Sequence, residues 1–397
     1  MTRFVTHDLK LAPSLDERAG QDFVSSLRAH VLNHMASNMR ARFDAEIAPH
    51  LGTQANSRDV LKAMLPRPDF QFYTATRTRA QQMVWSSVRA TIERQRSDLA
   101  ERAARLSQNQ ANAQGSLILD PDLAIPKNVS AIDVHLMPGS YSFDGGEADI
   151  AAGSLYDNGL SVFSFGLMGE TLDDIGQSIA LWLSLRHPQF QPQAVLDLGC
   201  SVGHQSLPWK RTFPSAKVIG LDVAPACLRY AHARAQSMGI TAHFLQADAT
   251  AVPLPDGSQD LVFSSMFLHE LPADDVGAVF REAHRLLRPG GLMLHYELPP
   301  NEALSAYDGF YLDWDGRYNA EPYYQSYRDL SPPALASDAG FAPEAYFQAA
   351  VPSLGWYGEA AVRKAVSGAT DVGSDTVGRL ADGVQWFVYG AWKEQPE

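Results

Sequence analysis

Glycine residues that could bring the backbone close to a ligand follow a short apolar run near the middle of the chain. The sequence there is Asp197-Leu198-Gly199-Cys200-Ser201-Val202-Gly203. Glycine lets the backbone turn sharply and approach a ligand without a Cβ in the way. We expect a helix from residue 204 onward, whose free N–H groups would face a carboxylate or a phosphate. The glycines alone are a weak signal, because they are compatible with a dinucleotide, with a mononucleotide or with no ligand.

Acidic residues stand where two further expected strands end. Asp222 closes the first of these strands, and Asp248 follows the second. A carboxylate in this position can accept hydrogen bonds from both hydroxyl groups of a ribose, and a hydrogen bond to a charged group contributes about 1.5–3 kcal/mol. The fingerprint of nicotinamide cofactors fails, because the positions that need its later glycines hold Ser201 and His204.

These residues lie in a segment where strands and helices alternate. Strands are predicted at residues 194–198, 217–222, 242–246, 261–265 and 292–297, and helices at 172–185, 204–213, 226–238 and 273–287. This alternation predicts a parallel sheet with helices on both faces, an α/β fold. The last strands, near residues 344–351 and 384–393, follow without a regular strand–helix unit between them.

Together, these elements resemble class I S-adenosylmethionine-dependent methyltransferases, whose first motif reads acidic-x-Gly-x-Gly-x-Gly. Here Ser201 replaces the middle glycine, and the turn Leu286–Gly291 is similar to the family's entry into its fifth strand. The resemblance is closest to the small-molecule branch, which is ubiquinone-biosynthesis-like and plant-type O-methyltransferase-like. It implies a seven-stranded Rossmann-like sheet, S-adenosyl-L-methionine as cofactor with S-adenosyl-L-homocysteine as product, and no metal.

The resemblance also implies which residues bind the cofactor. Asp222 would hold the ribose and Asp248 the adenine amino group, while Tyr156, just before the first expected helix of this domain, would close over the cofactor or form an aromatic rim. The complete set is Asp197, Gly199, Cys200, Ser201, Gly203, Asp222, Val223, Asp248, Ala249, Ser264 and Tyr156.

Methyl transfer is an in-line displacement, in which alignment of the reactants can supply about 7–11 kcal/mol, so a general base is optional. His269 is the candidate base, with Glu270 orienting its ring. In plant-type O-methyltransferases, a histidine in a similar Leu-His-acidic stretch deprotonates a phenol. The alternative is that His269 only packs or caps. His295 and Glu297 share one strand face and would contact substrate, or would be satisfied by neighbours.

Aromatic residues are dense between residues 307 and 327. They predict a lid over about residues 300–330, in which Tyr307, Tyr311 and Trp314 would contact a hydrophobic acceptor. The alternative is that this segment packs against the N-terminal helices or against a partner subunit.

Residues 1–154 are expected to form a mainly helical extension that ends in loops, with the methyltransferase domain over residues 155–397. Apolar residues at every fourth position predict a long helix at 16–47, and a second follows at 74–106. A linker is expected at 107–115, then loops with a small hairpin. Because such helices need a packing partner, they would cap the substrate site or form a homodimer.

Composition narrows the function. The formal charge of −13 argues against a nucleic-acid partner. The chain has two cysteines, Cys200 and Cys227, which predict a reducing, cytoplasmic setting. No apolar stretch is long enough to span a bilayer, so no membrane partner is expected. The sequence therefore predicts a cytoplasmic enzyme that O-methylates an aromatic or hydrophobic small molecule. The alternatives are N-, S- or C-methylation, a protein substrate, or a cofactor-binding module without catalysis.

Overall fold

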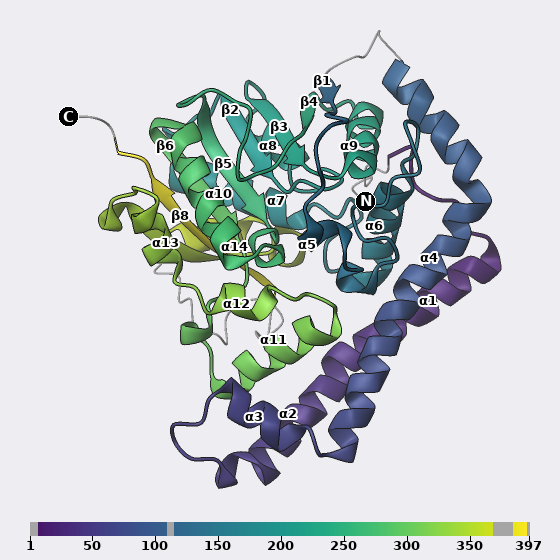
Figure 1. Ribbon diagram of the computed structural model, residues 1–397, viewed down its shortest axis with the longest axis vertical. Coiled ribbons are helices and arrows are strands. Elements are labelled where there is room, and N and C mark those ends of the chain that lie inside the picture. Colours follow the sequence, from purple (N-terminus) through teal and green to yellow (C-terminus); the bar gives the residue numbers. More distant parts are fainter. Residues whose placement is uncertain (1–6, 109–114, 368–383, 395–397) are drawn as a thin grey trace.

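The computed structural model describes residues 7–108, 115–367 and 384–394, and its centre is a single sheet (Figure 1). The sheet has eight strands in the order β1-β4-β3-β2-β5-β6-β8-β7. Strands β1 to β6 pair in parallel, whereas β8 is antiparallel to both β6 and β7. Their bounds are β1 Gly115–Ile118, β2 Ala194–Leu198, β3 Lys217–Asp222, β4 Ala242–Gln246, β5 Gln259–Ser265, β6 Leu287–Tyr296, β7 Tyr346–Pro352 and β8 Gln385–Trp392.

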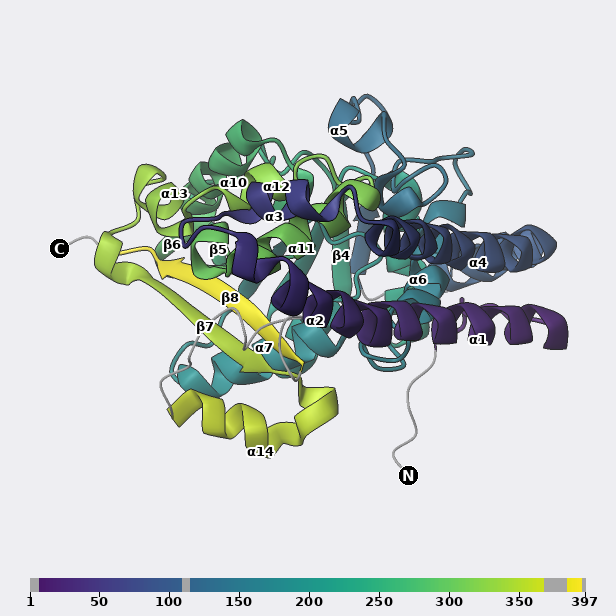
Figure 2. The ribbon, with the colours of Figure 1, turned by 90° about the horizontal axis from the view of Figure 1, so that it is seen from below.

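Helices cover both faces of the sheet because its central strands are apolar on both sides. In β2, Val195 packs into the core under one face, and its neighbour Leu196 packs into the core under the other. Figure 2 shows α7 and α14 on one side of the strands and α10 and α13 on the other. The bounds of these helices and of α9 are α7 Asp174–Arg186, α9 Pro225–Ser237, α10 Ala273–Leu286, α13 Pro332–Asp338 and α14 Leu354–Ser367.

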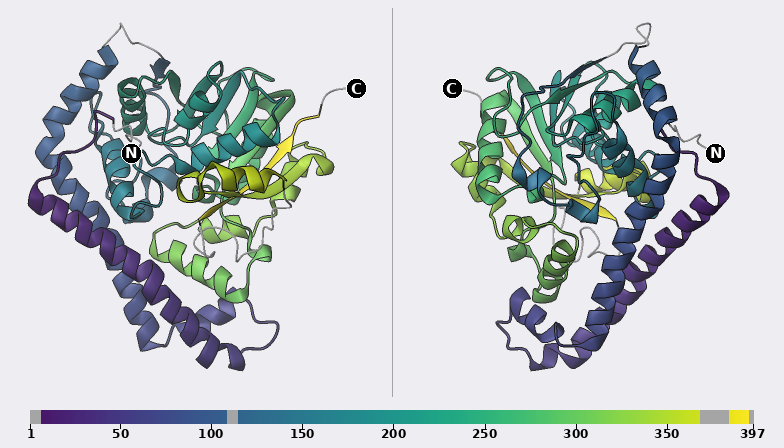
Figure 3. Two further views of the ribbon diagram at one scale, coloured as in Figure 1. Left: turned by 180° about the vertical axis from the view of Figure 1, so that it is seen from behind. Right: turned by 45° about the vertical axis from the view of Figure 1, so that its right-hand side comes forward.

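The two long N-terminal helices that the sequence predicted are confirmed. The first consists of α1 (Leu15–Ala29), a π-helical turn (His30–Met35) and α2 (Ala36–Glu46), and the second is α4 (Pro68–Gln108). They lie side by side and project past the sheet in every view (Figure 3). The apolar residues of α4 pack against α6 (Ala151–Phe163) and α9 in one core, so the extension is continuous with the body of the molecule.

The segment after these helices differs from the prediction. The expected linker at residues 107–115 falls largely outside the described residues, since 109–114 are among those left out. Instead of a small hairpin, β1 pairs in parallel with β4 and adds an eighth strand to the predicted seven. The predicted boundary at residue 154 falls inside α6. The sequence pattern of β1 alone cannot reveal this pairing, because its partner β4 lies far along the chain.

Among the described residues, no helix is both long enough and apolar enough to cross a bilayer.

Candidate active site

The loop between β2 and α8 (Leu207–Thr212) turns through three left-handed backbone positions. The φ angles are +68° at Gly199, +48° at Ser201 and +75° at Gly203. A Cβ at Gly199 would lie 2.2 Å from the ring of Phe267, so both space and conformation require glycine there. Ser201 adopts the left-handed conformation that the glycine it replaces would adopt freely, so the loop keeps its path despite the substitution. The backbone N–H groups of such turns line concavities that suit polar ligands.

A hydrogen bond joins the residues that flank this loop. The Ser206 hydroxyl donates to the carboxylate of buried Asp197, and burial raises the pKa of Asp197 to about 7. Asp197 therefore holds the start of the loop to Ser206 at its end. The helix was expected from residue 204 but begins at Leu207 and has six residues. Within the loop, the N–H groups of Cys200, Ser201 and Gly203 donate to the Leu221 carbonyl, the Asp222 carboxylate and the Cys200 carbonyl.

Asp222, at the end of β3, faces this loop. Its carboxylate accepts hydrogen bonds from the backbone N–H groups of Ser201 and Ala224, at 2.8 and 2.9 Å. Each carboxylate oxygen carries a second lone pair, so the group can still accept from a diol. Burial raises the pKa of Asp222 above its usual range. The carboxylate is thus fixed, half-buried and available beside the glycine loop, as a ribose site requires.

The neighbouring predicted contacts line the same edge of the sheet. Asp248 is half-buried after β4, where its Oδ1 accepts from the backbone N–H and the hydroxyl of Thr250. The Val223 carbonyl accepts from Gln246 at 3.0 Å, which ties the ends of β3 and β4 together. Cys200 and Ala249 are buried and supply apolar wall.

Tyr156 lies within α6 and not before a helix as predicted. Its ring contacts Tyr141 edge-on, with centroids 5.1 Å apart, and lies 5.9 Å from the ring of His204. Burial raises the pKa of Tyr156, and the nearby Glu270 and Asp222 carboxylates add to the effect. Tyr156 therefore lies beside Tyr141 and beside His204, the residue that follows the glycine loop.

Asp157, the residue after Tyr156, links the end of the glycine loop to His7, the first described residue of the chain. Its carboxylate lies 2.6 Å from His204 Nε2 and 3.2 Å from His7 Nε2, and it accepts from the Tyr230 hydroxyl at 2.7 Å. Burial alone would raise the pKa of Asp157, but the two histidines hold it well below its usual range. The buried carboxylate thus fixes the residue that directly follows Gly203.

Two predicted site residues turn away from this edge. The Ser264 hydroxyl and His295 Nδ1 are 2.7 Å apart, and both side chains are buried. The His295 ring stacks on Phe280 of α10, and burial lowers the pKa of His295 to about 3. His295 is therefore a neutral core residue, which was the alternative to substrate contact, and the side chain of Ser264 is occupied by it.

His269 lies just after β5, and its partner is Glu297 instead of the predicted Glu270. The Glu297 carboxylate lies 2.7 Å from His269 Nδ1, and its other oxygen accepts from the N–H groups of Phe267 and Leu268. Burial alone would lower the pKa of His269, but the Glu297 charge prevails and raises it to about 9. His269 Nε2 is 3.9 Å from Glu270 Oε1, beyond hydrogen-bond distance, and the His269 side chain is buried.

Glu270 pairs with a residue that the sequence did not single out. His135 Nε2 is 3.1 Å from Glu270 Oε1, and His135 Nδ1 is 3.0 Å from Glu321 Oε1. Sequence patterns gave no signal for His135 or Glu321, because the two belong to irregular segments far apart along the chain and meet only in the fold. Among the described residues, no group of three or more His, Cys, Asp or Glu side chains could hold a metal ion.

The predicted lid is divided between two roles. Its helix α11 (Ala306–Tyr318) buries Tyr307, Tyr311 and Trp314 against the N-terminal helices, with Tyr73 stacked on Trp314 at 4.9 Å. This packing is the alternative that the sequence left open, although Trp314 also lines a pocket together with Glu321. The rings of Tyr324 and Tyr327 in α12 (Tyr324–Arg328) instead lie 5.3 and 6.4 Å from the His269 ring.

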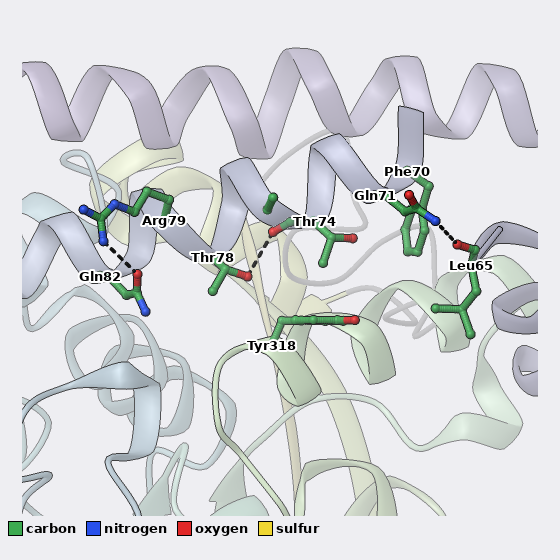
Figure 4. Close-up of a pocket in the computed structure, with 9 residues that line it drawn as sticks. Leu65, Phe70, Gln71, Thr74, Thr78, Arg79, Gln82 and Tyr318 are labelled. Atoms are coloured by element: carbon green, nitrogen blue, oxygen red, sulfur yellow. Dashed lines mark hydrogen bonds between the residues drawn. The ribbon is translucent and has the colours of Figure 1, made fainter. Parts of the chain in front are cut away.

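A pocket of about 460 Å³ lies elsewhere, between α4 and the end of α11 (Figure 4). Thr74, Thr78 and Tyr318 border it, and Arg79 is turned toward Gln82, 3.3 Å away. Arg79 is the charged residue of its lining, and none of the glycine-loop or His269 residues contributes. The chemistry described above therefore does not take place in this pocket.

Comparison with known proteins identifies a methyltransferase segment in the chain. Residues 195–291 match the family described as "Methyltransferase domain". The chain is 37% identical over 109 residues to a demethylmenaquinone methyltransferase of Thermus thermophilus, covering 28% of this chain and 49% of that protein. It is 38% identical over 103 residues to a malonyl-[acyl-carrier protein] O-methyltransferase of Hahella chejuensis, covering 26% and 36%.

A solved O-methyltransferase family protein from Burkholderia thailandensis is 15% identical, with coverage of 63% of this chain and 61% of that one and a TM-score of 0.40. The chain spans less than half the length of each of the two curated relatives. The matched segment contains the glycine loop, Asp222, Asp248 and His269. The chain therefore contains a class I S-adenosylmethionine-dependent methyltransferase domain.

Proposed function

We propose that the chain is an enzyme that transfers a methyl group from S-adenosylmethionine to the oxygen of a small aromatic or otherwise hydrophobic molecule. The observation that carries this proposal is the buried His269–Glu297 pair, 2.7 Å apart, beside the edge that holds the glycine loop and Asp222. A positioned histidine with a carboxylate behind it is the arrangement of a general base.

The cofactor half of the proposed site consists of the loop and the strand ends. The residues present fit the group, because the Asp222 carboxylate lies beside the left-handed loop and keeps lone pairs for a diol. We propose that Gly199, Ser201 and Gly203 hold the amino-acid end of the cofactor and Asp222 its ribose. Asp248 and Val223 would border the adenine, and Tyr156 would close the site.

The acceptor half performs the proton transfer. When bound, S-adenosylmethionine supplies the methyl group as an electrophile and leaves as S-adenosylhomocysteine. His269 Nε2 takes the hydroxyl proton of the acceptor while Glu297 holds Nδ1–H and so fixes the tautomer with a free Nε2. Tyr324 and Tyr327 provide aromatic surface beside the reacting oxygen.

The experiment measures methyl transfer from labelled S-adenosylmethionine to a panel of phenols, catechols and short-chain carboxylic acids. We expect wild-type protein to methylate at least one phenol and His269→Gln to lower kcat by about 10²–10⁴, the usual contribution of a general base, with unchanged affinity for S-adenosylhomocysteine. Product analysis separates oxygen from carbon, nitrogen or sulfur methylation. Unchanged kcat in His269→Gln would overturn the base role.

The helical extension supports two smaller proposals. It would complete the acceptor site, since His135 reaches Glu270 from it, and it would form a homodimer through apolar side chains exposed on its long helices, Leu15, Phe23 and Phe72. A monomer mass by light scattering would contradict the dimer. Both cysteines are free thiols, which supports a cytoplasmic location.

A further inference from the structure

A strained segment of the extension enters the acceptor half of the site. The φ angles of His135, Leu136 and Ser140 are +58°, +56° and +53°, although none of the three is glycine. Backbone strain of this kind persists only where the surrounding structure enforces it, and it is concentrated at functional sites. The strain here sets the position of the His135 side chain.

Two side chains of α4 hold this segment in place. Gln81 Nε2 and Trp85 Nε1 both donate to the His135 carbonyl, at 2.9 and 2.8 Å. Gln81 is itself held by a short hydrogen bond from buried Arg28 of α1. The long helices of the extension therefore determine where the His135 ring lies.

The His135 ring bridges two carboxylates of the methyltransferase part. Its Nε2 is 3.1 Å from Glu270 and its Nδ1 is 3.0 Å from Glu321, which follows α11. Asn319 lies 2.8 Å from the same ring nitrogen and donates a short hydrogen bond to Glu321. With both ring nitrogens facing carboxylates, the arrangement favours the doubly protonated, positively charged imidazole.

These charges also face His269. Glu297 and Glu270 lie 2.7 and 3.9 Å from its ring nitrogens, and the Glu321 charge reaches both histidines. Further titratable neighbours among the described residues are the phenols of Tyr324 and Tyr327 beside His269, of Tyr141 beside His135 and of Tyr156 near Glu270. Burial alone would lower the pKa of His135, but Glu321 and Glu270 raise it to about 10. At neutral pH one positive charge therefore offsets two carboxylates next to the base.

We propose that His135 is a positioning residue of the active site, which clamps Glu270 and Glu321 and offsets their charge beside His269. The N-terminal extension then acts on the reaction itself, because it controls how readily His269 gives up its proton. Without the His135 charge, Glu270 and Glu321 would stabilise protonated His269 further and move the loss of its proton to still higher pH. The proposal rests on the proposed role of His269.

The test follows the ring of His269 by NMR in full-length protein with ¹³C-labelled histidine. Its signal is identified by its loss in His269→Gln. We expect His135→Gln to raise the titration midpoint of His269 by about one pH unit, the size of shift that a neighbouring charge produces. His135→Lys keeps a positive charge and should return the midpoint toward the wild-type value. His50→Gln, an exposed histidine of the same extension, should change nothing.

An unchanged or lowered midpoint in folded His135→Gln would overturn the proposal, as would an equal rise in His135→Lys. A purely structural role would reduce thermal stability in both variants without a rise of the midpoint that appears in His135→Gln and is absent in His135→Lys. Because the NMR titration needs no turnover, a wild-type protein without methyl transfer would count against the proposed function alone. Where turnover is measured, the rise of kcat with pH should shift upward by the same amount in His135→Gln.

Discussion

The two halves of the proposed site are built in different ways. Apart from Tyr156, the cofactor half comes from one continuous stretch, in which the glycine loop and Asp222 follow neighbouring strands. The acceptor half is assembled from segments far apart along the chain, since His135, His269, Glu297 and Glu321 belong to different elements. Short-range geometry thus makes the first half, whereas the packing of the extension makes the second. This difference predicts that substitutions in one half leave the binding function of the other intact.

The largest effect that separates the halves is expected at Gly199. In Gly199→Ala the new Cβ would meet the Phe267 ring at 2.2 Å on a left-handed backbone, so the loop must move. We expect loss of S-adenosylhomocysteine binding by calorimetry, with a cost in stability of about 1–3 kcal/mol. Gly239→Ala is the matched control, because φ is +64° there but no atom lies within 4 Å of the added Cβ. Equal affinity for S-adenosylhomocysteine in both variants would contradict the proposed role of the glycine loop in cofactor binding.

A smaller effect is expected from Glu297→Gln, which tests the acceptor half alone. The amide would donate to His269 Nδ1 and leave the proton on Nε2, the tautomer that cannot act as a base, so kcat should fall by about 10²–10⁴. Cofactor affinity should not change.

The pH dependence of kcat provides a second test of Glu297→Gln. The pKa of His269 is raised to about 9, so the neutral base forms, and wild-type kcat rises, as the pH increases toward 9. Removing the Glu297 charge should move that rise to lower pH. Glu270→Gln is the companion variant, and its effect on kcat should be smaller because Glu270 is 3.9 Å from the ring. A larger loss in Glu270→Gln would restore the original assignment of Glu270 as the orienting residue.

The difference between the cofactor half and the acceptor half also explains which parts of the site the sequence could predict. The strands β2, β3 and β4 match the predicted ranges in full, because runs such as Val195–Leu198 end in recognisable turns. The positions of Asp222 and the glycine loop follow from those strands. The Glu297–His269 contact could not be read in this way, since a two-residue strand period places Glu297 on a face but does not say which loop crosses that face.

The extension shows the same limit. Its helices were predicted from apolar spacing, and the burial of Val84 and Val88 agrees. Their partner was not predictable, because an amphipathic stripe fits a lid, a second subunit or the domain itself equally well. For the same reason, the aromatic residues of α11 fitted a substrate lid and packing against the N-terminal helices equally well, and the structure buries them against α4. His135 stood in a segment predicted as loops and a hairpin, where nothing indicated chemistry.

The most direct test of the account is calorimetric titration of S-adenosylhomocysteine into the wild-type protein and into Asp222→Ala. The account predicts one-to-one binding by the wild type and affinity about 10–100-fold weaker in the variant, as expected for lost hydrogen bonds to a charged group. Absence of binding by the wild type, or equal affinity in the two proteins, would contradict the claim that Asp222 and the glycine loop form the cofactor site.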